Sequence, residues 1–349
     1  MTQWIKKRVA WFLLAGVWLM ATTAQAELIV LAAPLSDDPY YAEVREGIFD
    51  FHVAFANGIG AGDSVLVLTD GASYEKYARV LGAERVAIAP MPDIWMRDFS
   101  DANPTHPVMF RYTAAGQGGG RVGQREADQV QDVLFALTQK ARLDFQESDL
   151  LNDGGNWVTD GFGQVVVSRK FLRDNALTEA AARKRLRKLP GVNHIAFIEA
   201  DEQGGLEHAD GVVNFVGENI LMVNSYPDDP DYARELEADL KRGLPGVQIH
   251  PITTPYDGSQ VYDERFGSAC GLYTNALTTP NYIYLPQFGI PQDQIAIKQI
   301  KALTNKQIIP IPTEQVCFMG GGVRCMSWQL RGGNASRLLD YFRKGDVGR

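Results

Sequence analysis

The chain alternates between short apolar runs and longer amphipathic stretches. The short runs are rich in Val, Ile and Leu, which favours β-strands, and the longer stretches carry apolar residues at helical spacing. This alternation predicts an α/β fold, and no Pro/Ser-rich linker divides it. The predicted strands cover residues 64–68, 85–89, 164–168, 219–223, 282–285 and 307–311, and the predicted helices cover residues 38–55, 73–81, 126–140, 177–187, 231–244 and 293–303.

The N-terminal segment has the pattern of an export signal. A basic region at residues 6–8 precedes an apolar run at residues 9–20, and Ala24-Gln25-Ala26 fits the small-x-small cleavage pattern. The apolar run is shorter than the roughly 20 residues that span a bilayer, so a membrane anchor is the weaker alternative. We therefore expect a signal peptide at residues 1–26, one domain at residues 27–349, and a periplasmic or secreted protein.

The expected mature chain is acidic. Loss of residues 1–26 removes three of the 34 basic residues and none of the 42 acidic ones, which leaves a net charge of −11. Such a charge argues against a nucleic-acid partner. It attracts cationic substrates, although an acidic surface that serves solubility is an equally good explanation.

The cysteines and histidines show no metal-binding spacing. Three cysteines, an odd number, leave at least one thiol that is free or pairs between molecules. No CxxC occurs, and the five histidines form no HExxH, so we expect no structural zinc. The cysteines are Cys270, Cys317 and Cys325.

Residues 118–123 formally match the dinucleotide fingerprint GxGxxG. A strand-like run at residues 108–112 precedes them, and a predicted helix follows. However, this run contains Arg111, and residues 113–117 separate it from the glycines, whereas the fingerprint places them at the strand–helix turn itself. We therefore favour a mobile surface loop, such as a lid, over a nucleotide site.

Cys325 follows the glycines of Gly320-Gly321-Gly322-Val323-Arg324. Consecutive glycines permit close approaches that other residues obstruct, so this cysteine can be presented in a cleft. A nearby Arg324 guanidinium would favour the reactive thiolate. The alternative is a small buried hydrophobe after a glycine turn.

His208-Ala209-Asp210 precedes an apolar run at residues 212–216. We expect His208 and Asp210 to lie on an extended strand, where side chains two residues apart point to the same face. The His208 imidazole, a candidate acid/base, and the Asp210 carboxylate would then lie on the same side of the strand. The alternative is a histidine whose ring is satisfied in or near the core.

Two further motifs offer acids and an aromatic ring. Trp95 and Asp98 follow the predicted strand at 85–89, so a ring that stacks on a flat cation and a carboxylate that accepts its N–H groups occur together. The alternative is a surface ion pair of Arg97 and Asp98. Asp153-Gly154-Gly155-Asn156 is either an ordinary turn or the source of another acid in the cleft.

Taken in this order, the motifs WMRD, DGGN, HAD and GGGVRC resemble the agmatine deiminase and Porphyromonas-type peptidyl-arginine deiminase family of the guanidine-modifying superfamily. The match runs from about residue 28 to residue 330. The resemblance implies a pentein-type fold, a propeller-like fan of five ββαβ modules around a central active site. The strand–helix alternation permits this fold.

The resemblance also implies the roles of the site residues. Asp98 and Asp210 match the two carboxylates that grip the guanidinium, His208 matches the general acid/base, and Cys325 matches the nucleophile. Asn275 resembles a supporting asparagine of the site. The other expected substrate-binding residues are Trp95, Asp153, Arg111 and Arg121.

The resemblance leaves three points open. Asp153 stands where many agmatine deiminases carry Glu, and Arg324 replaces the histidine that is common before the nucleophile, which puts substrate identity and thiolate tuning in doubt. With Cys325 as the free thiol, export permits a disulfide between Cys270 and Cys317, but their spacing does not establish one.

The implied activity is that of an exported hydrolase acting on the C–N bonds of linear amidines. Cysteine attack on the guanidinium carbon, acid/base catalysis and a covalent thiouronium intermediate require neither a metal nor an organic cofactor. Export favours peptidyl arginine, converted to peptidyl citrulline and ammonia. The alternative is agmatine, converted to N-carbamoylputrescine in putrescine biosynthesis. A noncatalytic binder of arginine peptides and an amidinotransferase are minor alternatives.

The segment 111–125 is the expected specificity loop. It follows the strand candidate after Asp98, and its glycines favour mobility. Arg111 and Arg121 would repel the amine of agmatine and bind a peptide carboxylate, as arginines of this region do in the Porphyromonas-type enzymes. A solvated loop with scattered charges is an equally good alternative.

Overall fold

The computed structural model describes residues 26–201 and 206–344. The expected signal peptide lies outside these residues except for Ala26. Within the described ranges, no helix combines the length and the apolar character needed to cross a membrane.

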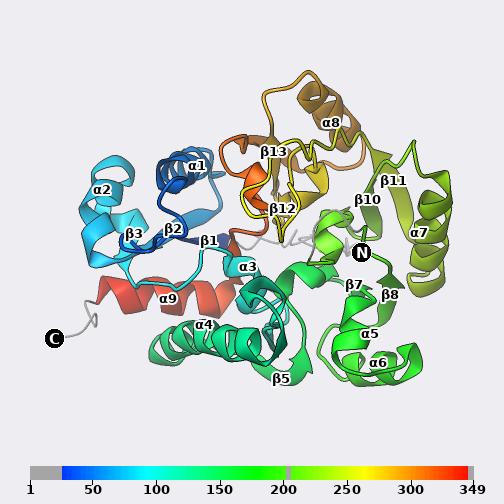
Figure 1. Ribbon diagram of the computed structural model, residues 1–349, viewed down its shortest axis with the longest axis horizontal. Coiled ribbons are helices and arrows are strands. Elements are labelled where there is room, and N and C mark those ends of the chain that lie inside the picture. The colour runs from blue at the N-terminus through cyan, green and yellow to red at the C-terminus, as the bar shows by residue number, and fades with distance from the viewer. Residues whose placement is uncertain (1–25, 202–205, 345–349) are drawn as a thin grey trace, which may run out of the picture.

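The described strands form five sheets that lie around the centre of the molecule (Figure 1). One sheet has four strands, one has two, and three have three strands each. In sheet order they are β15 (Trp328–Arg331), β1 (Glu27–Ala32), β2 (Ser64–Thr69) and β3 (Val86–Ile88); β4 (Val108–Arg111) and β5 (Gln146–Leu151); β6 (Val158–Thr159), β7 (Gln164–Ser168) and β8 (His194–Ile198); β9 (Val213–Gly217), β10 (Ile220–Asn224) and β11 (Gln248–Ile252); and β12 (Leu277–Thr278), β13 (Tyr282–Gln287) and β14 (Gln307–Pro312).

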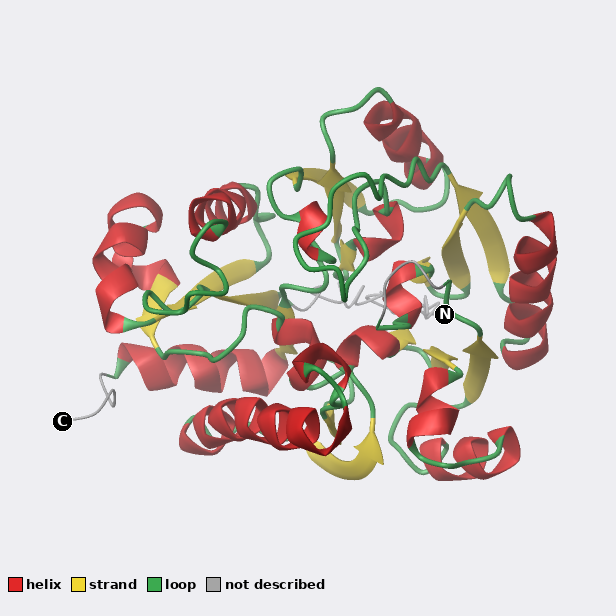
Figure 2. Ribbon diagram, viewed as in Figure 1, coloured by secondary structure: helices red, strands yellow, loops and turns green. Residues whose placement is uncertain are grey.

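The helices lie mostly at the periphery, whereas short helical turns lie near the centre (Figure 2). The α-helices are α1 (Arg45–Asn57), α2 (Gly71–Leu81), α3 (Met96–Phe99), α4 (Gly120–Lys140), α5 (Lys170–Asp174), α6 (Glu179–Leu186), α7 (Pro230–Gly243), α8 (Gln292–Lys301) and α9 (Gly332–Arg343). The turns near the site are the 3-10 helices η3 (Gly154–Asn156), η5 (Ala209–Gly211), η6 (Tyr273–Asn275) and η7 (Cys317–Met319).

A ββαβ pattern recurs along the chain. Strand β9 pairs antiparallel with β10, helix α7 follows, and β11 returns parallel to β10. The sheets of β6–β8 and β12–β14 have the same arrangement. At the chain ends, β15 pairs antiparallel with β1, so the last described strand completes the sheet that the first one begins. This topology agrees with the α/β fold expected from the resemblance and fits a fan of five modules.

Strand β1 shows why the central strands are continuous apolar runs. All six of its residues are buried. Ile29 and Leu31 pack into a core with helix α1, whereas Leu28 and Val30 pack into a second core with helices α4 and α9. Because both faces of the sheet are covered by helices, no polar alternation is required.

All of the predicted strands and helices occur, and all but the strand at 164–168 have at least one shifted end. The largest shift is in the predicted helix 38–55, because residues 38–44 form turns in which Asp38 accepts a hydrogen bond from the Tyr40 backbone, and α1 begins only at Arg45. Several elements were not predicted, among them β1, β5, β15 and α9. The sequence QESDLL of β5 is half exposed and largely polar, so it lacks the apolar pattern that identifies a strand.

Candidate active site

Turns from several modules bring the candidate residues together. Asp98 lies in α3, His208 and Asp210 lie in or next to η5, and Asn275 lies in η6. Cys325 follows η7 and precedes β15. Each of these turns precedes the first strand of one sheet, so a repeated scaffold position supplies one or two side chains per module. The prediction that His208 and Asp210 lie on a strand is wrong, because β9 begins only at Val213.

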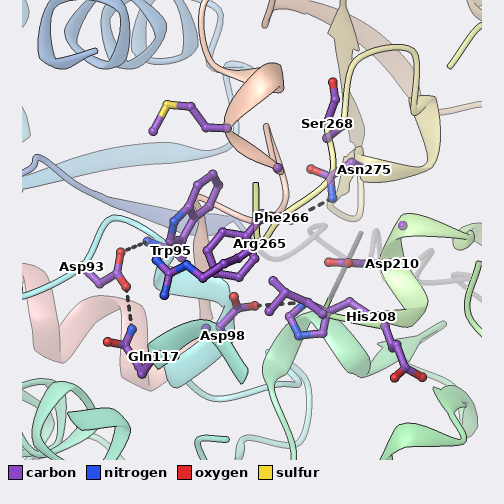
Figure 3. A pocket seen from close by; sticks show the side chains of 18 of the residues that line it. Asp93, Trp95, Asp98, Gln117, His208, Asp210, Arg265, Phe266, Ser268 and Asn275 are labelled. Carbon is purple, nitrogen blue, oxygen red and sulfur yellow. Dashed lines mark hydrogen bonds and ion pairs between the residues drawn. The ribbon is translucent and has the colours of Figure 1, made fainter. Parts of the chain in front are cut away.

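These side chains line one pocket of about 360 Å³ (Figure 3). The volume is within the range of small-molecule sites. The expected residues that line it are Trp95, Asp98, His208, Asp210, Asn275 and Cys325.

Cys325 lies buried at this pocket and is the one cysteine with a free thiol. The Asn275 amide donates a hydrogen bond to its Sγ at 2.9 Å, and the same amide accepts one from the Gly322 backbone at 3.1 Å. Burial, together with the nearby carboxylates of Asp210 and Asp98, raises the pKa of the Cys325 thiol well above its usual value. This environment favours the neutral thiol over the thiolate.

Arg324 does not act on the thiol as expected from the sequence. Its Nε donates to Asp210 Oδ2 at 3.1 Å, and its Nη2 donates to the Trp157 carbonyl at 2.9 Å. The guanidinium and the carboxylate are both buried. Arg324 thus pairs with one of the candidate substrate carboxylates and orients it.

His208 lies between two acids. Its Nε2 is 2.9 Å from Asp153 Oδ2, and its Nδ1 is 3.7 Å from Asp98 Oδ1. Burial opposes protonation, but Asp98 and Asp153 outweigh it and raise the pKa of His208 to about 9. The imidazole is therefore a protonated acid at neutral pH.

Asp153 holds His208 and does not line the pocket. Its oxygens accept hydrogen bonds from the backbone N–H and the hydroxyl of Thr113, both at 2.9 Å, in addition to the His208 contact. Burial raises the pKa of Asp153, but the hydrogen bond and charge of His208 bring it below its usual value. We expected Asp153 to bind substrate. Its contacts indicate that it positions the His208 ring instead.

Asp98 is a buried acid that faces His208. Its Oδ1 accepts no hydrogen bond from the described residues and lies 3.7 Å from His208 Nδ1. Burial raises the pKa of Asp98 to about 7, although the charge of His208 lowers it. Burial also raises the pKa of Asp210 despite Arg324. Two buried carboxylates with raised pKa values are poised for a cation, which would restore their charged forms.

Glycines permit the close packing of these groups. A Cβ on Gly155 would lie 2.5 Å from His208 Nδ1 and 2.9 Å from Asp98 Oδ1. A Cβ on Gly321 would lie 2.4 Å from the Trp95 ring and 2.8 Å from the Cys325 Cβ. The glycines of DGGN and GGGVRC are therefore required by close approach.

The two arginines expected in a specificity loop lie away from the pocket. Arg111, at the end of β4, forms a bidentate pair with Asp128 of α4, at 2.9 and 2.7 Å. Arg121 is exposed in the first turn of α4. Much of the segment 111–125 is ordered as a 3-10 turn and as the start of α4, because the glycines begin a helix there. Of this segment, Tyr112 and residues 116–117 line the pocket.

Sequence reasoning missed several lining residues. Asp93 accepts hydrogen bonds from the Tyr41 hydroxyl at 2.7 Å and from the Gln117 amide at 3.1 Å. Arg265 and Phe266 also line the pocket (Figure 3), from an irregular segment that no periodic pattern marks. Asp93 stands two residues before Trp95, so its place beside the WMRD motif was the available signal.

Across residues 26–201 and 206–344, no group of three or more His, Cys, Asp or Glu side chains is arranged to hold a metal ion.

Comparisons with known proteins agree with this geometry. The family model described as Porphyromonas-type peptidyl-arginine deiminase matches residues 18–330. A curated relative from Vibrio parahaemolyticus, named for agmatine deiminase activity, is 25% identical over 313 residues, which cover 79% of this chain and 86% of the relative. The solved structure of C. jejuni agmatine deiminase superimposes with a TM-score of 0.72 at 19% identity, covering 89% of this chain and 94% of that chain. Agmatine deiminase of Enterococcus faecalis gives a TM-score of 0.69 at 18% identity, covering 88% and 93%. The chain belongs to the Porphyromonas-type peptidyl-arginine deiminase family, whose sequence relatives include agmatine deiminases, hydrolases of amidine C–N bonds.

Proposed function

We propose that this protein hydrolyses the guanidinium group of agmatine and releases ammonia and N-carbamoylputrescine. The observation that carries the proposal is that two buried carboxylates, Asp98 and Asp210, line the same pocket as the Cys325 thiol. Buried carboxylates favour a ligand that brings N–H donors and positive charge.

The first half-reaction uses the protonated His208. The guanidinium lies between Asp98 and Asp210. Its positive charge offsets the two carboxylates and so lowers the pKa of the Cys325 thiol. The thiol proton passes to solvent water, and the resulting thiolate attacks the guanidinium carbon and forms the S–C bond. His208 donates its proton to the departing nitrogen as the C–N bond breaks, so ammonia leaves and an S-alkylthiouronium remains.

The second half-reaction uses the now neutral His208. It takes a proton from water as the water oxygen attacks the thiouronium carbon. The C–S bond breaks, the Cys325 thiolate is released, and loss of a proton leaves the ureido product. Asp153 holds the ring in place through both steps, since its contact with Nε2 leaves Nδ1 facing Asp98.

The charge of the pocket supports agmatine. Among the described lining residues, acids greatly outnumber the two basic side chains, Arg265 and His208. A substrate with a second cationic end is favoured in such a field over one that carries a carboxylate. The lining acids are Asp38, Asp93, Asp98, Glu126, Asp201, Glu207 and Asp210.

Peptidyl arginine is the second candidate, because Arg265 lies in the pocket wall. Its Nε and Nη2 bond Asp263, which leaves Nη1 as the donor for a substrate carboxylate. A peptide ending in arginine would place its carboxylate beyond the guanidinium, where this arginine can meet it.

A substrate screen decides between the two. Ureido product and ammonia should form from agmatine with a higher kcat/KM than from free arginine or from a peptide ending in arginine. Cys325→Ala should lose turnover by at least about 10⁴-fold and still bind agmatine. If only the peptide is turned over, peptidyl arginine and not agmatine is the substrate. Turnover that survives in Cys325→Ala would contradict the mechanism.

We also propose that the protein is exported with cleavage after Ala26. The disulfide between Cys270 and Cys317 suits an oxidising compartment. In addition, the Glu27 backbone N–H donates to the Asp63 carboxylate at 3.0 Å, so cleavage would place a new ammonium group against an acid. Mass analysis of the native protein should find Glu27 at the N-terminus. An uncleaved chain in the cytoplasmic fraction would overturn the proposal.

A further inference from the structure

One wall of the pocket comes from a segment without regular secondary structure. Residues 253–272 are all described and contain no helix or strand. Arg265, Phe266, Ser268 and Ala269 of this segment line the pocket that holds Cys325 (Figure 3). The wall of a substrate pocket must keep a defined position, so the contacts that hold this segment matter for binding.

Burial contributes little to holding the segment. Residues 253–267 include no buried residue, and burial begins only at Ser268 and Ala269. Because apolar burial is the main term that offsets the entropy of ordering a chain, this stretch depends on specific links. Segments with few buried contacts open locally at low free-energy cost.

The strongest link is the disulfide between Cys270 and Cys317. It ties the segment to η7, and two backbone hydrogen bonds join the same elements, Ala269 N–H to the Cys317 carbonyl at 2.8 Å and Tyr262 N–H to the Phe318 carbonyl at 2.9 Å. Met319 and Gly320, two and three residues after Cys317, also line the pocket. The disulfide therefore joins two pieces of the pocket wall.

The middle of the segment is held by polar contacts at the rim. Asp263 accepts hydrogen bonds from the Arg265 side chain and, at 3.0 Å, from the Tyr40 hydroxyl. Phe266 lies beneath the Arg265 guanidinium, 5.0 Å from the ring centroid. These contacts are exposed and individually weak, so the covalent link decides where Arg265 and Phe266 lie.

We infer that the Cys270–Cys317 disulfide is a positioning element of the substrate pocket, and that its reduction weakens binding of the substrate chain without altering the reacting groups. A dithiol reductant would convert the disulfide to two thiols and itself become a disulfide. Cys325 takes no part in this exchange and keeps its contact with Asn275. The inference rests on the proposed function for its ligand.

Binding is measured in Cys325→Ala, where the disulfide is the one redox-active group because the chain has three cysteines. Dithiothreitol should raise the Kd for agmatine about tenfold, the effect of releasing a few ordered side chains. The matched control, Cys270→Ser/Cys317→Ser/Cys325→Ala, should bind with the weaker Kd and be insensitive to dithiothreitol. An unchanged Kd after complete reduction of Cys325→Ala would overturn the inference.

Kinetics separate positioning from a loss of structure. In Cys270→Ser/Cys317→Ser the KM for agmatine should rise about tenfold while kcat stays within about threefold. Alkylation of Cys325 by 2-chloroacetamidine, a short amidine without a chain, should keep its rate. A fall in kcat and alkylation rate with unchanged KM would contradict the inference. If this variant fails to fold, the same comparison is made on wild type reduced after folding.

Proteolysis tests the wall without any ligand, so its result is independent of the proposed function. Trypsin cleavage after Arg265 should be at least about tenfold faster in reduced than in oxidised Cys325→Ala, because local opening limits cleavage. Equal cleavage rates would show that the disulfide does not position this segment. If agmatine alone is not turned over, the proposed substrate is wrong, but the proteolysis result still tests the role of the disulfide.

Discussion

The floor and the rim of the pocket are built in different ways. The floor consists of Asp98, His208, Asp210 and Cys325, which lie on turns at repeated positions of the scaffold and contact one another or buried partners. The rim consists of the segment 253–272, with little burial and no regular structure. The difference implies that the reaction is fixed by the fold, whereas the choice of substrate depends on loops.

The floor can be broken at Arg324, where we expect the largest effect on stability. Arg324→Met leaves the buried Asp210 carboxylate without its cation, which should lower the free energy of unfolding by about 3–5 kcal/mol. Urea denaturation measures this. Arg337→Met, which removes an exposed pair with Asp144, is the control and should cost about 0–1 kcal/mol. Equal effects of the two variants would show that the Arg324 pair is not a buried support of the floor.

The next effect concerns Asp98. Asp98→Asn keeps the size and removes the charge that faces the cation, so kcat/KM for the best substrate should fall by about 30-fold to several-thousand-fold, equivalent to about 2–5 kcal/mol. Asp128→Asn, a carboxylate paired with Arg111 outside the pocket, is the matched control and should keep kcat/KM. If Asp98→Asn retains wild-type kcat/KM, the substrate cation lies elsewhere.

A smaller effect is expected on pH dependence through Asp153. Because the pKa of His208 is raised to about 9, its acid form is lost as pH rises through about 9, and so is the stability that its ion contacts contribute. That stability is fully present below the unfolded-state pKa near 6.5. Asp153→Asn removes one of the negative charges that raise the pKa of His208. The alkaline limb of the plot of kcat against pH should therefore move to lower pH. A limb that stays in place would show that Asp153 does not tune His208.

The smallest effect sharpens the description of the rim. Arg111→Ala/Arg121→Ala should leave the ratio of kcat/KM for agmatine to that for free arginine unchanged, because neither side chain lines the pocket. Arg265→Gln should raise this ratio a few-fold, because it removes the cation that can bind the carboxylate of free arginine. If the ratio changes in Arg111→Ala/Arg121→Ala and not in Arg265→Gln, the segment 111–125 determines substrate specificity.

Much of the floor was predictable because local motifs carry it. The glycines beside His208 and Cys325 are needed at fixed positions for close approach, so DGGN and GGGVRC are visible in the sequence. Asp153 was recognised as an acid of the site, but its role was not. Whether it faces substrate or His208 depends on Thr113, which lies 40 residues away in the chain.

The sequence by itself determined the α/β alternation, the four site motifs and the residue types of the chemistry, because periodicity and glycine requirements are local. The tertiary structure decided the rest. It directed Arg324 to Asp210 and not to the thiol, gave His208 its raised pKa, and brought Arg265 to the pocket through a disulfide. These outcomes depend on burial and on distances between residues far apart in the chain, which the order of amino acids alone does not display.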